Sequence, residues 1–277
     1  MTESKMKNII VADDQGFCWG VRRALDIVEQ YDEVYIFGDL IHNKQVVSQL
    51  EKRGKQIIHE VTGNEKRPVV ITAHGTTIEN LKMFEELKLD IVDTTCPLVS
   101  KIYNVGESLE QQGYHIIIIG DKDHVEVKGI ASRMHQPVIV KDEGDIESAT
   151  FPDKVGIICQ STFSEEKFHK LALQIESRVR EAKIRNTTCS PTKKRQEAAA
   201  SLAQQVDIMI VVGGYHSSNT KKLKEITSAY VESYHIETAD QLEKEWFENK
   251  KEIGITSGAS TSDWIVEEIC GKIREFT

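Results

Sequence analysis

Short runs of apolar residues recur along the whole chain, and in several of them every position is apolar, as in residues 116–119. Such uninterrupted runs are typical of strands that are buried on both faces, as in parallel sheets. The runs cover residues 8–12, 34–37, 69–73, 91–92, 115–120, 138–140, 155–159, 208–212 and 253–256. Between many of them lie longer stretches with helical spacing, such as Leu171-Ile175-Val179. Strands that alternate with helices predict an α/β fold with mainly parallel sheets.

Three cysteines, Cys18, Cys96 and Cys189, each stand where an expected strand runs into an expected helix. The segments Thr94-Thr95-Cys96-Pro97 and Thr187-Thr188-Cys189-Ser190-Pro191 resemble each other, which indicates a weak internal repeat. We therefore predict three pseudo-equivalent α/β domains of about 90 residues each. Their expected bounds are residues 14–97, 98–190 and 191–277.

The overall charge is acidic, with 35 Lys and Arg against 44 Asp and Glu and a net charge of −9. Nucleic acid is therefore not an expected partner, because phosphate backbones select basic surfaces. The apolar run at 116–119 is far too short to cross a bilayer, and the first residues lack the pattern of a signal peptide. We expect a cytoplasmic protein with no membrane partner. In that compartment the five cysteines stay reduced, which favours metal binding or catalysis over disulfides.

A helix N-terminus stabilises a thiolate, because its free N–H groups and its dipole favour negative charge. Three thiolates without a clear fourth ligand fit an iron–sulfur cluster that has one iron free of cysteine, whereas structural zinc normally takes four ligands. The alternative for each cysteine is a small apolar core residue. We expect that simpler role for Cys159, inside an apolar run, and for Cys270, on a helix.

Polar loops follow several of the expected strands and carry His42, His74 and His124. Histidines at such positions can donate to phosphate oxygens, although a single one is more often an ordinary surface residue. The hydroxyl-rich segments 217–220 and 257–262 each precede an expected helix. They fit either N-caps or a phosphate-binding cradle of hydroxyls and helix N-terminal amides, and both roles can hold together.

Glu126 lies two residues after His124, and its carboxyl group can deliver protons to a reacting centre. The alternative is an ordinary solvated glutamate in a loop. Ser161 and Thr162 end another expected strand, and their hydroxyls can relay those protons.

Taken in order, these motifs resemble the IspH/LytB family of 4-hydroxy-3-methylbut-2-enyl diphosphate reductases over essentially the whole chain. The matching segments are Gly16-Phe17-Cys18, His42-Asn43, Ala73-His74-Gly75, 93–99 with Cys96, 124–129, Gln160-Ser161-Thr162, Cys189 with Arg195-Gln196-Glu197-Ala198, Ser217-Ser218-Asn219 and Gly258-Ala259-Ser260. Small departures from the family pattern occur at Trp19, Asp121, Val125, Lys128 and Ser161, the last of which keeps a hydroxyl.

The resemblance implies a cloverleaf of three domains around one central 4Fe–4S cluster per chain, with the N-terminal strand, residues 1–13, joining the third domain. It implies that Cys18, Cys96 and Cys189 hold three irons and that the fourth iron binds the allylic hydroxyl oxygen of the substrate. The residues implied to hold the diphosphate are His42, His74, Ser217, Ser218, Asn219 and Ser260. Glu126 would supply protons through Ser161 or Thr162 with help from His124, and these last three residues would also contact the substrate.

The implied reaction is a reductive dehydroxylation that gives isopentenyl and dimethylallyl diphosphate, the last step of the non-mevalonate (MEP) isoprenoid route. Ferredoxin or flavodoxin would supply the electrons. Two alternatives remain open: a non-redox 4Fe–4S hydro-lyase that acts on a small phosphorylated alcohol, and a non-catalytic iron or redox sensor. A hydro-lyase needs no electron donor, and a sensor needs no diphosphate cradle.

Overall fold

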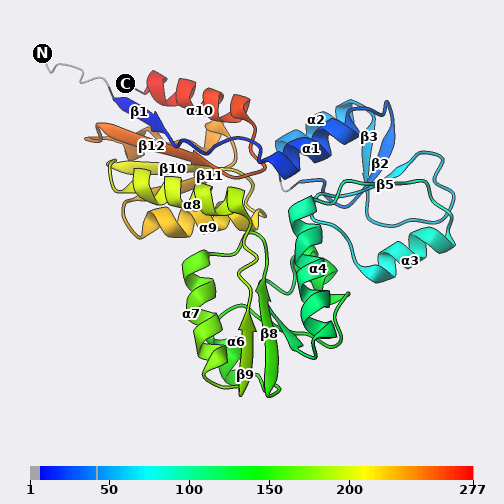
Figure 1. Cartoon of the computed structure of the whole chain (residues 1–277). Helices are drawn as coiled ribbons and strands as arrows, with labels where there is room; N and C mark the ends of the chain where they lie inside the picture. Colours follow the sequence, from blue (N-terminus) through cyan, green and yellow to red (C-terminus); the bar gives the residue numbers. More distant parts are fainter. Residues whose placement is uncertain (1–6, 42, 277) are drawn as a thin grey trace, which may run out of the picture. The chain divides into compact units, whose positions relative to one another are not determined.

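The computed structural model describes residues 7–41 and 43–276 and contains, within them, three four-stranded sheets (Figure 1). Every neighbouring pair of strands is parallel. The prediction of three α/β units with parallel sheets is therefore confirmed. Parallel strands place all their carboxyl ends at one edge of a sheet, which is where ligands gather in such folds.

The described residues form two compact units. Unit 1 comprises the described residues within the ranges 1–21, 42–46 and 190–277. Unit 2 comprises residues 22–41 and 47–189. One boundary between the units falls directly after Cys189. The three domains expected at 14–97, 98–190 and 191–277 stay a prediction.

Unit 1 contains one sheet with the strand order β1-β12-β10-β11. Its strands are β1 (Asn8–Val11), β10 (Ile208–Val212), β11 (Ser233–Ile236) and β12 (Glu252–Ser257). Its helical segments are α8 (Ser190–Ala203), α9 (Ser218–Ser228), η1 (Ala239–Gln241), η2 (Lys244–Phe247) and α10 (Asp263–Glu275). The N-terminal strand pairs with a strand from the other end of the chain, since Asn8 is in register with Glu252.

Unit 2 contains the other two sheets, with the strand orders β3-β2-β4-β5 and β7-β6-β8-β9. The strands of the first are β2 (Val34–Phe37), β3 (Lys55–Ile58), β4 (Val69–Ile71) and β5 (Ile91–Asp93). Those of the second are β6 (His115–Ile119), β7 (Val138–Val140), β8 (Lys154–Cys159) and β9 (Glu181–Ile184). The helices are α3 (Ile78–Glu86), α4 (Pro97–Gln111), α5 (Val125–Ala131), α6 (Glu143–Ser148) and α7 (Glu165–Glu176). Helices α1 (Trp19–Val28) and α2 (Lys44–Lys52) each begin in unit 1 and end in unit 2.

Strand β6 shows why its apolar run is uninterrupted. Ile116 and Ile118 pack into a core with residues of α4 and α5, whereas Ile117 and Ile119 pack into a second core with residues of α6 and α7. Successive residues of a strand point to opposite faces, so the two pairs enter different cores. All four side chains are fully buried. Figure 1 shows α4 and α7 on opposite sides of this sheet. Both faces are therefore covered, as the sequence pattern predicts.

Within the described residues, no helix combines the length and the apolar character that crossing a bilayer requires.

Candidate functional site

Each of the three predicted cysteines lies directly before a helix. Helix α1 begins one residue after Cys18, Cys96 is the N-cap of α4, and α8 begins one residue after Cys189. All three are unoxidised and half-buried. The predicted position of these cysteines between a strand and a helix is confirmed.

The other two cysteines are buried in apolar cores, Cys159 in β8 and Cys270 in α10. Burial raises the pKa of both thiols above the ordinary value of 9.0. They therefore stay protonated, as expected for cysteines that serve only in packing.

In unit 2, Cys96 lies close to two of the predicted histidines. Its backbone N–H donates to the carbonyl oxygen of Ala73 at 3.0 Å, which places the end of β5 beside the residue before His74. The rings of His74 and His124 meet edge to face, with centroids 5.6 Å apart and planes at 85°. His124 is the N-cap of α5, where its Nδ1 accepts from the backbone N–H of Glu126 at 3.2 Å. This contact fixes the ring of His124 at the start of the helix that carries Glu126.

Glu126 is a buried carboxyl group, with only 1% of its surface exposed, so the structure excludes a solvated loop glutamate. Ser161 holds both of its oxygens: the backbone N–H donates to Oε1 at 2.6 Å and the hydroxyl donates to Oε2 at 2.7 Å. Burial raises the pKa of Glu126 above the ordinary 4.5, although these two hydrogen bonds oppose the rise. The carbonyl oxygen of Ser161 accepts from the backbone N–H of Cys189 at 3.0 Å. Ser161 is thus hydrogen-bonded both to the carboxyl group of Glu126 and to the backbone of Cys189.

Thr162, the second hydroxyl predicted here, accepts from Nε2 of Gln160 through its Oγ1 at 3.0 Å. Both residues follow β8 at the carboxyl edge of its sheet, as expected for a relay position. Unit 2 therefore places Thr162 next to Ser161, directly after β8, where Ser161 hydrogen-bonds to Glu126 of α5.

Sequence reasoning missed a pair that joins the loop after His74 to helix α5. The guanidinium of Arg133 stacks on the ring of Tyr103 at 3.8 Å and donates to the carbonyl oxygens of Thr76 at 2.9 Å and Gly129 at 2.6 Å. The Tyr103 hydroxyl is buried without a hydrogen-bond partner among the described residues, and burial raises the pKa of Tyr103 to about 12. Nothing in the local sequence signals this pair, because its partners come from α4, α5 and the β4–α3 loop.

Gly75→Ala is expected to destabilise the protein by about 2–4 kcal/mol. Gly75 has φ of 78°, and an added Cβ would lie 2.1 Å from the Tyr103 hydroxyl oxygen. Gly113 is a matched control, since its φ is 80° but its Cβ would meet nothing within 4 Å. Gly113→Ala should therefore cost only the conformational part, about 1–2 kcal/mol. Urea unfolding of both variants measures the difference, and equal losses would contradict the packing argument.

In unit 1, a buried arginine secures the loop that leads to Cys18. Arg195, 3% exposed, donates to the carbonyl oxygens of Ser257 at 2.8 Å and Gly16 at 3.0 Å. The backbone N–H of Gly16 donates to the Ser257 hydroxyl at 3.1 Å, and that of Cys18 donates to the carbonyl oxygen of Ala259 at 3.0 Å. The sequence marks Arg195 only as part of a motif, and its role as a positioning residue needed the structure.

The predicted phosphate cradle is also in unit 1, at the N-terminus of α9. Ser217 is the N-cap and accepts from the backbone N–H of Thr220 at 3.3 Å, so the N-cap role holds. Asn219 is 4% exposed, and neither its Oδ1 nor its Nδ2 has a hydrogen-bond partner among the described residues. Ser218 is half-buried, and Ser260 is 7% exposed in the loop after β12. A buried amide with both polar atoms unpaired is rare and points to a ligand that supplies the missing partners.

The two loops of this cradle are adjacent, because Gly258 donates its backbone N–H to the carbonyl oxygen of Val212 at 2.8 Å. A Cβ on Gly258 would lie 2.1 Å from the Thr220 hydroxyl oxygen, so the Ser260 loop passes closely against α9. His42, also predicted for the diphosphate, lies outside the described residues.

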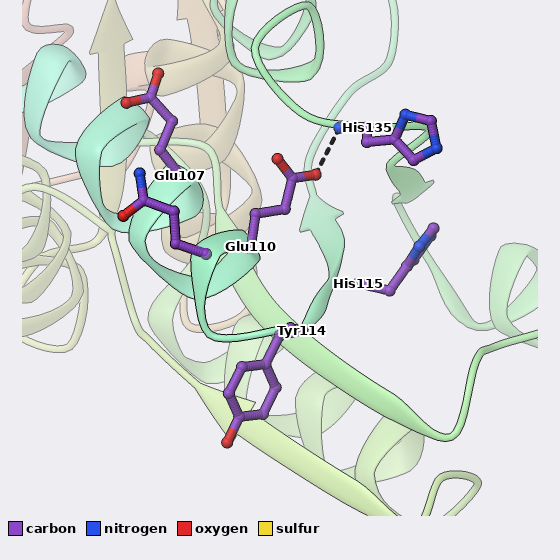
Figure 2. Close-up of a pocket in the computed structure, with 7 residues that line it drawn as sticks. Glu107, Glu110, Tyr114, His115 and His135 are labelled. Atoms are coloured by element: carbon purple, nitrogen blue, oxygen red, sulfur yellow. Dashed lines mark hydrogen bonds between the residues drawn. The ribbon is translucent and has the colours of Figure 1, made fainter.

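A separate hollow of about 630 Å³ lies in unit 2 between α4 and the β6 and β7 ends of the sheet. Figure 2 shows Glu110 reaching toward His135, whose backbone N–H donates to its carboxylate at 2.5 Å. None of the predicted site residues that the structure describes lines this hollow. We therefore assign no part of the predicted chemistry to it.

Comparison with known proteins adds a family to this geometry. A family model described as "LytB protein" matches residues 9–274. A protein of Alkaliphilus oremlandii (strain OhILAs) named 4-hydroxy-3-methylbut-2-enyl diphosphate reductase is 41% identical, over 97% of this chain and 99% of its own length. This chain belongs to the LytB protein family.

Further LytB relatives agree in length and in fold. A protein of the same name from Geobacter sulfurreducens is 38% identical over 97% of both chains. The solved structure of (E)-4-hydroxy-3-methyl-but-2-enyl diphosphate reductase, described as the terminal enzyme of the non-mevalonate pathway, is 36% identical with a TM-score of 0.68 and covers 98% of this chain and 100% of that one. That of E-1-hydroxy-2-methyl-but-2-enyl-4-diphosphate reductase from Plasmodium falciparum is 28% identical with a TM-score of 0.91, covering 96% and 87%.

LytB proteins are iron–sulfur enzymes, and the donor set of this chain fits such a group. Three half-buried thiols, each directly before a helix, are the soft ligands that iron–sulfur clusters take. Cys18 belongs to unit 1, and Cys96 and Cys189 belong to unit 2. In the described part of the chain, no three His, Cys, Asp or Glu side chains stand together as a site for a metal ion. That the three cysteines hold one cluster stays a prediction.

Proposed function

We propose that this chain is a 4-hydroxy-3-methylbut-2-enyl diphosphate reductase. It removes the allylic hydroxyl of the substrate by reduction: two electrons and two protons enter, the C–O bond breaks, a C–H bond forms and water leaves. The products are isopentenyl and dimethylallyl diphosphate, at the end of the MEP isoprenoid pathway. Family membership over residues 9–274 supports this activity.

One observation on the chain itself carries the proposal, namely the buried carboxyl group of Glu126. Its raised pKa favours the protonated form, which is the form that a general acid needs. The Ser161 hydroxyl on Oε2 begins a hydrogen-bonded path away from the carboxyl group, and the His124 ring lies at the N-cap of the same helix, on the backbone N–H of Glu126. In this proposal Glu126 is the proton donor, Ser161 and Thr162 relay the proton and contact the substrate, and His124 assists.

A 4Fe–4S cluster bound by Cys18, Cys96 and Cys189 would supply the electrons one at a time and a Lewis-acidic iron for the alcohol. The chain's own residues bind and orient the rest of the substrate. Five polar side chains and His42 are proposed to hold the diphosphate, which fixes the alcohol in place. The five are His74, Ser217, Ser218, Asn219 and Ser260.

The unpaired atoms of Asn219 support the diphosphate role, because an anion together with its water shell would satisfy both. The helix dipole and the backbone N–H groups at the start of α9 favour negative charge at the same place. We place the enzyme in the cytoplasm, where the three thiols remain reduced. Ferredoxin or flavodoxin is the proposed electron donor.

The test is anaerobic purification, iron and sulfide analysis, and turnover of the substrate diphosphate with reduced methyl viologen. Formation of the two isoprenoid diphosphates that depends on the reduced dye supports the reductase. Product formation without any electron donor would instead support the hydro-lyase, and a bound cluster without turnover would support a sensor.

Asn219→Ala is expected to raise the KM for the substrate diphosphate by roughly 10-fold or more, with a smaller effect on kcat. The stability should hold or rise slightly, because the change removes two buried polar atoms that have no hydrogen-bond partner in the described part of the chain. Steady-state kinetics and thermal unfolding measure the two effects. Asn64→Ala, at an exposed position of the loop between β3 and β4, is the matched control and should leave the KM unchanged. A clear loss of stability with an unchanged KM would assign Asn219 to structure alone.

A further inference from the structure

A groove of about 240 Å³ on unit 2 runs between α4 and the end of β9. Its lining residues are Lys101, Asn104, Val105, Ser108, Leu109, Gln112, Lys183 and Arg185. All the charged residues among them are basic, although the chain as a whole has a net charge of −9. The groove is therefore a local positive surface on an acidic protein.

The cations at the far end of the groove are held in place by neighbouring side chains. Nζ of Lys183 donates to Oε1 of Gln112 and lies 5.4 Å from the centre of the Tyr114 ring. Nζ of Lys154 lies over the same ring at 4.3 Å. The nearby carboxylate of Glu181 accepts from the Tyr114 hydroxyl at 2.6 Å and pairs with Lys154 at 3.6 Å. Its negative charge is thus offset locally, and the groove keeps its positive field.

Charge is sorted between the two sides of α4. Lys101 lies on the groove side, whereas Glu107 and Glu110 line the hollow on the other side of the helix, as Figure 2 shows for the two acids. An acidic partner would be attracted to one side of α4 and repelled from the other, so this pattern sets an orientation as well as an attraction.

The groove also lies beside the segments that carry two of the cysteines. Lys101 is in the second turn of α4, so its Cα is about 7 Å along the helix axis from the Cys96 cap. Arg185 directly follows β9, and Cys189 comes four residues later. The backbone between them is tied to β8, since Thr187 Oγ1 accepts from the N–H of Cys159 at 2.8 Å. A protein seated in the groove would therefore contact both cysteine-bearing segments of unit 2.

We propose that the groove formed by Lys101, Lys183 and Arg185 docks an acidic protein that carries single electrons. This inference rests on the proposed function. Each turnover breaks one C–O bond, forms one C–H bond and releases water, which consumes two electrons and two protons. The carrier is oxidised by one electron in each of two encounters, so its complex has to form and dissociate rapidly. A small, charged and salt-sensitive surface suits such transient contacts.

The test compares two donors for the whole enzyme with its cluster: an acidic flavodoxin and reduced methyl viologen. The variant carries Lys101→Glu, Lys183→Glu and Arg185→Glu. We expect its KM for flavodoxin at low salt to rise at least about 10-fold, while turnover with saturating methyl viologen stays within about twofold. We expect the flavodoxin KM of the unchanged chain to rise with salt, and this rise should largely disappear in the variant.

A matched control carries the same charge change at three exposed lysines of the same unit: Lys52→Glu, Lys66→Glu and Lys82→Glu. A milder variant, Lys101→Gln with Arg185→Gln, leaves the packed Lys183 in place and should give a smaller shift in the same direction. A flavodoxin KM that rises no more than in the control would overturn the docking proposal, as would an equal loss with both donors.

Binding of oxidised flavodoxin, followed by calorimetry, separates docking from catalysis. Weaker binding by the groove variant than by the control supports the docking surface even without turnover. If the unchanged chain turns over with neither donor, the proposed function fails, and the binding result alone then decides whether the groove recognises the carrier. Equal binding by the groove variant and the control would overturn it.

Discussion

Glu126→Gln lowers the turnover number for the substrate diphosphate by about 10²–10⁴-fold, the range expected when a general acid is removed. The glutamine fills the same space and can accept from the N–H of Ser161 as the carboxyl group does. It cannot give up a proton. Iron content and the KM for the diphosphate should therefore change little, and a rapid-quench measurement of product formation gives the rate.

Glu147→Gln is the matched control, since it removes one exposed carboxylate from the same unit and should leave turnover unchanged. Turnover by Glu126→Gln within a few-fold of the unchanged enzyme would exclude Glu126 as the proton donor.

The pH dependence follows from the same carboxyl group. Its folded pKa lies above 4.5, so the protonated donor is lost as the pH rises through that folded value, and the single-turnover rate should fall with it. Stability has the same sign. The contribution of the neutral buried form is fully present below the unfolded pKa and is lost as the pH rises through the folded one. Glu126→Gln lacks this titration, so the urea midpoint of the unchanged protein should fall relative to that of the variant as the pH rises above 4.5.

Serine in place of Cys18, Cys96 or Cys189 should remove most of the iron and sulfide from the purified protein. A serine hydroxyl does not ionise near neutral pH, so a cluster that needs three thiolates loses one of its anchors. The expected iron content falls from about four per chain to less than about one, with loss of turnover. Anaerobic purification, metal analysis and the visible spectrum measure it.

Cys159→Ser and Cys270→Ser are the controls, because both thiols are buried in packed cores and are expected to stay protonated. They should keep the full iron content and show only a modest loss of stability. A normal cluster in any one of the first three variants would remove that cysteine from the proposed ligand set.

Most strands of the three sheets could be predicted from the sequence, and the strands that were not predicted share one property. The three missed strands, β3, β9 and β11, are all at the edge of their sheets. Their sequences, Lys-Gln-Ile-Ile, Glu-Ala-Lys-Ile and Ser-Tyr-His-Ile, mix polar and apolar residues. An edge strand is covered less than a central one, so it lacks the uninterrupted apolar run by which the central strands are recognised.

The residue types of the candidate site could be predicted, but their environments could not. From the sequence, Glu126 fits an exposed loop residue and a proton donor equally well. The contact that shows its buried position comes from Ser161, 35 positions away in the chain. The Arg195 contact with Gly16 spans 179 positions, and the pairing of Asn8 with Glu252 spans 244. Such distant contacts leave no local pattern in the sequence.

The amino-acid sequence alone determined the class of fold, the helix starts that follow Cys18, Cys96 and Cys189, and the family, because these depend on local periodicity and on motifs in order. The tertiary structure decided which polar groups lose contact with water. It buried Glu126 against Ser161, stacked Arg133 on Tyr103 and left both polar atoms of Asn219 without a hydrogen-bond partner in residues 7–41 and 43–276. Burial and hydrogen bonding set the pKa and the binding capacity of a side chain, and both arise only when distant segments pack together.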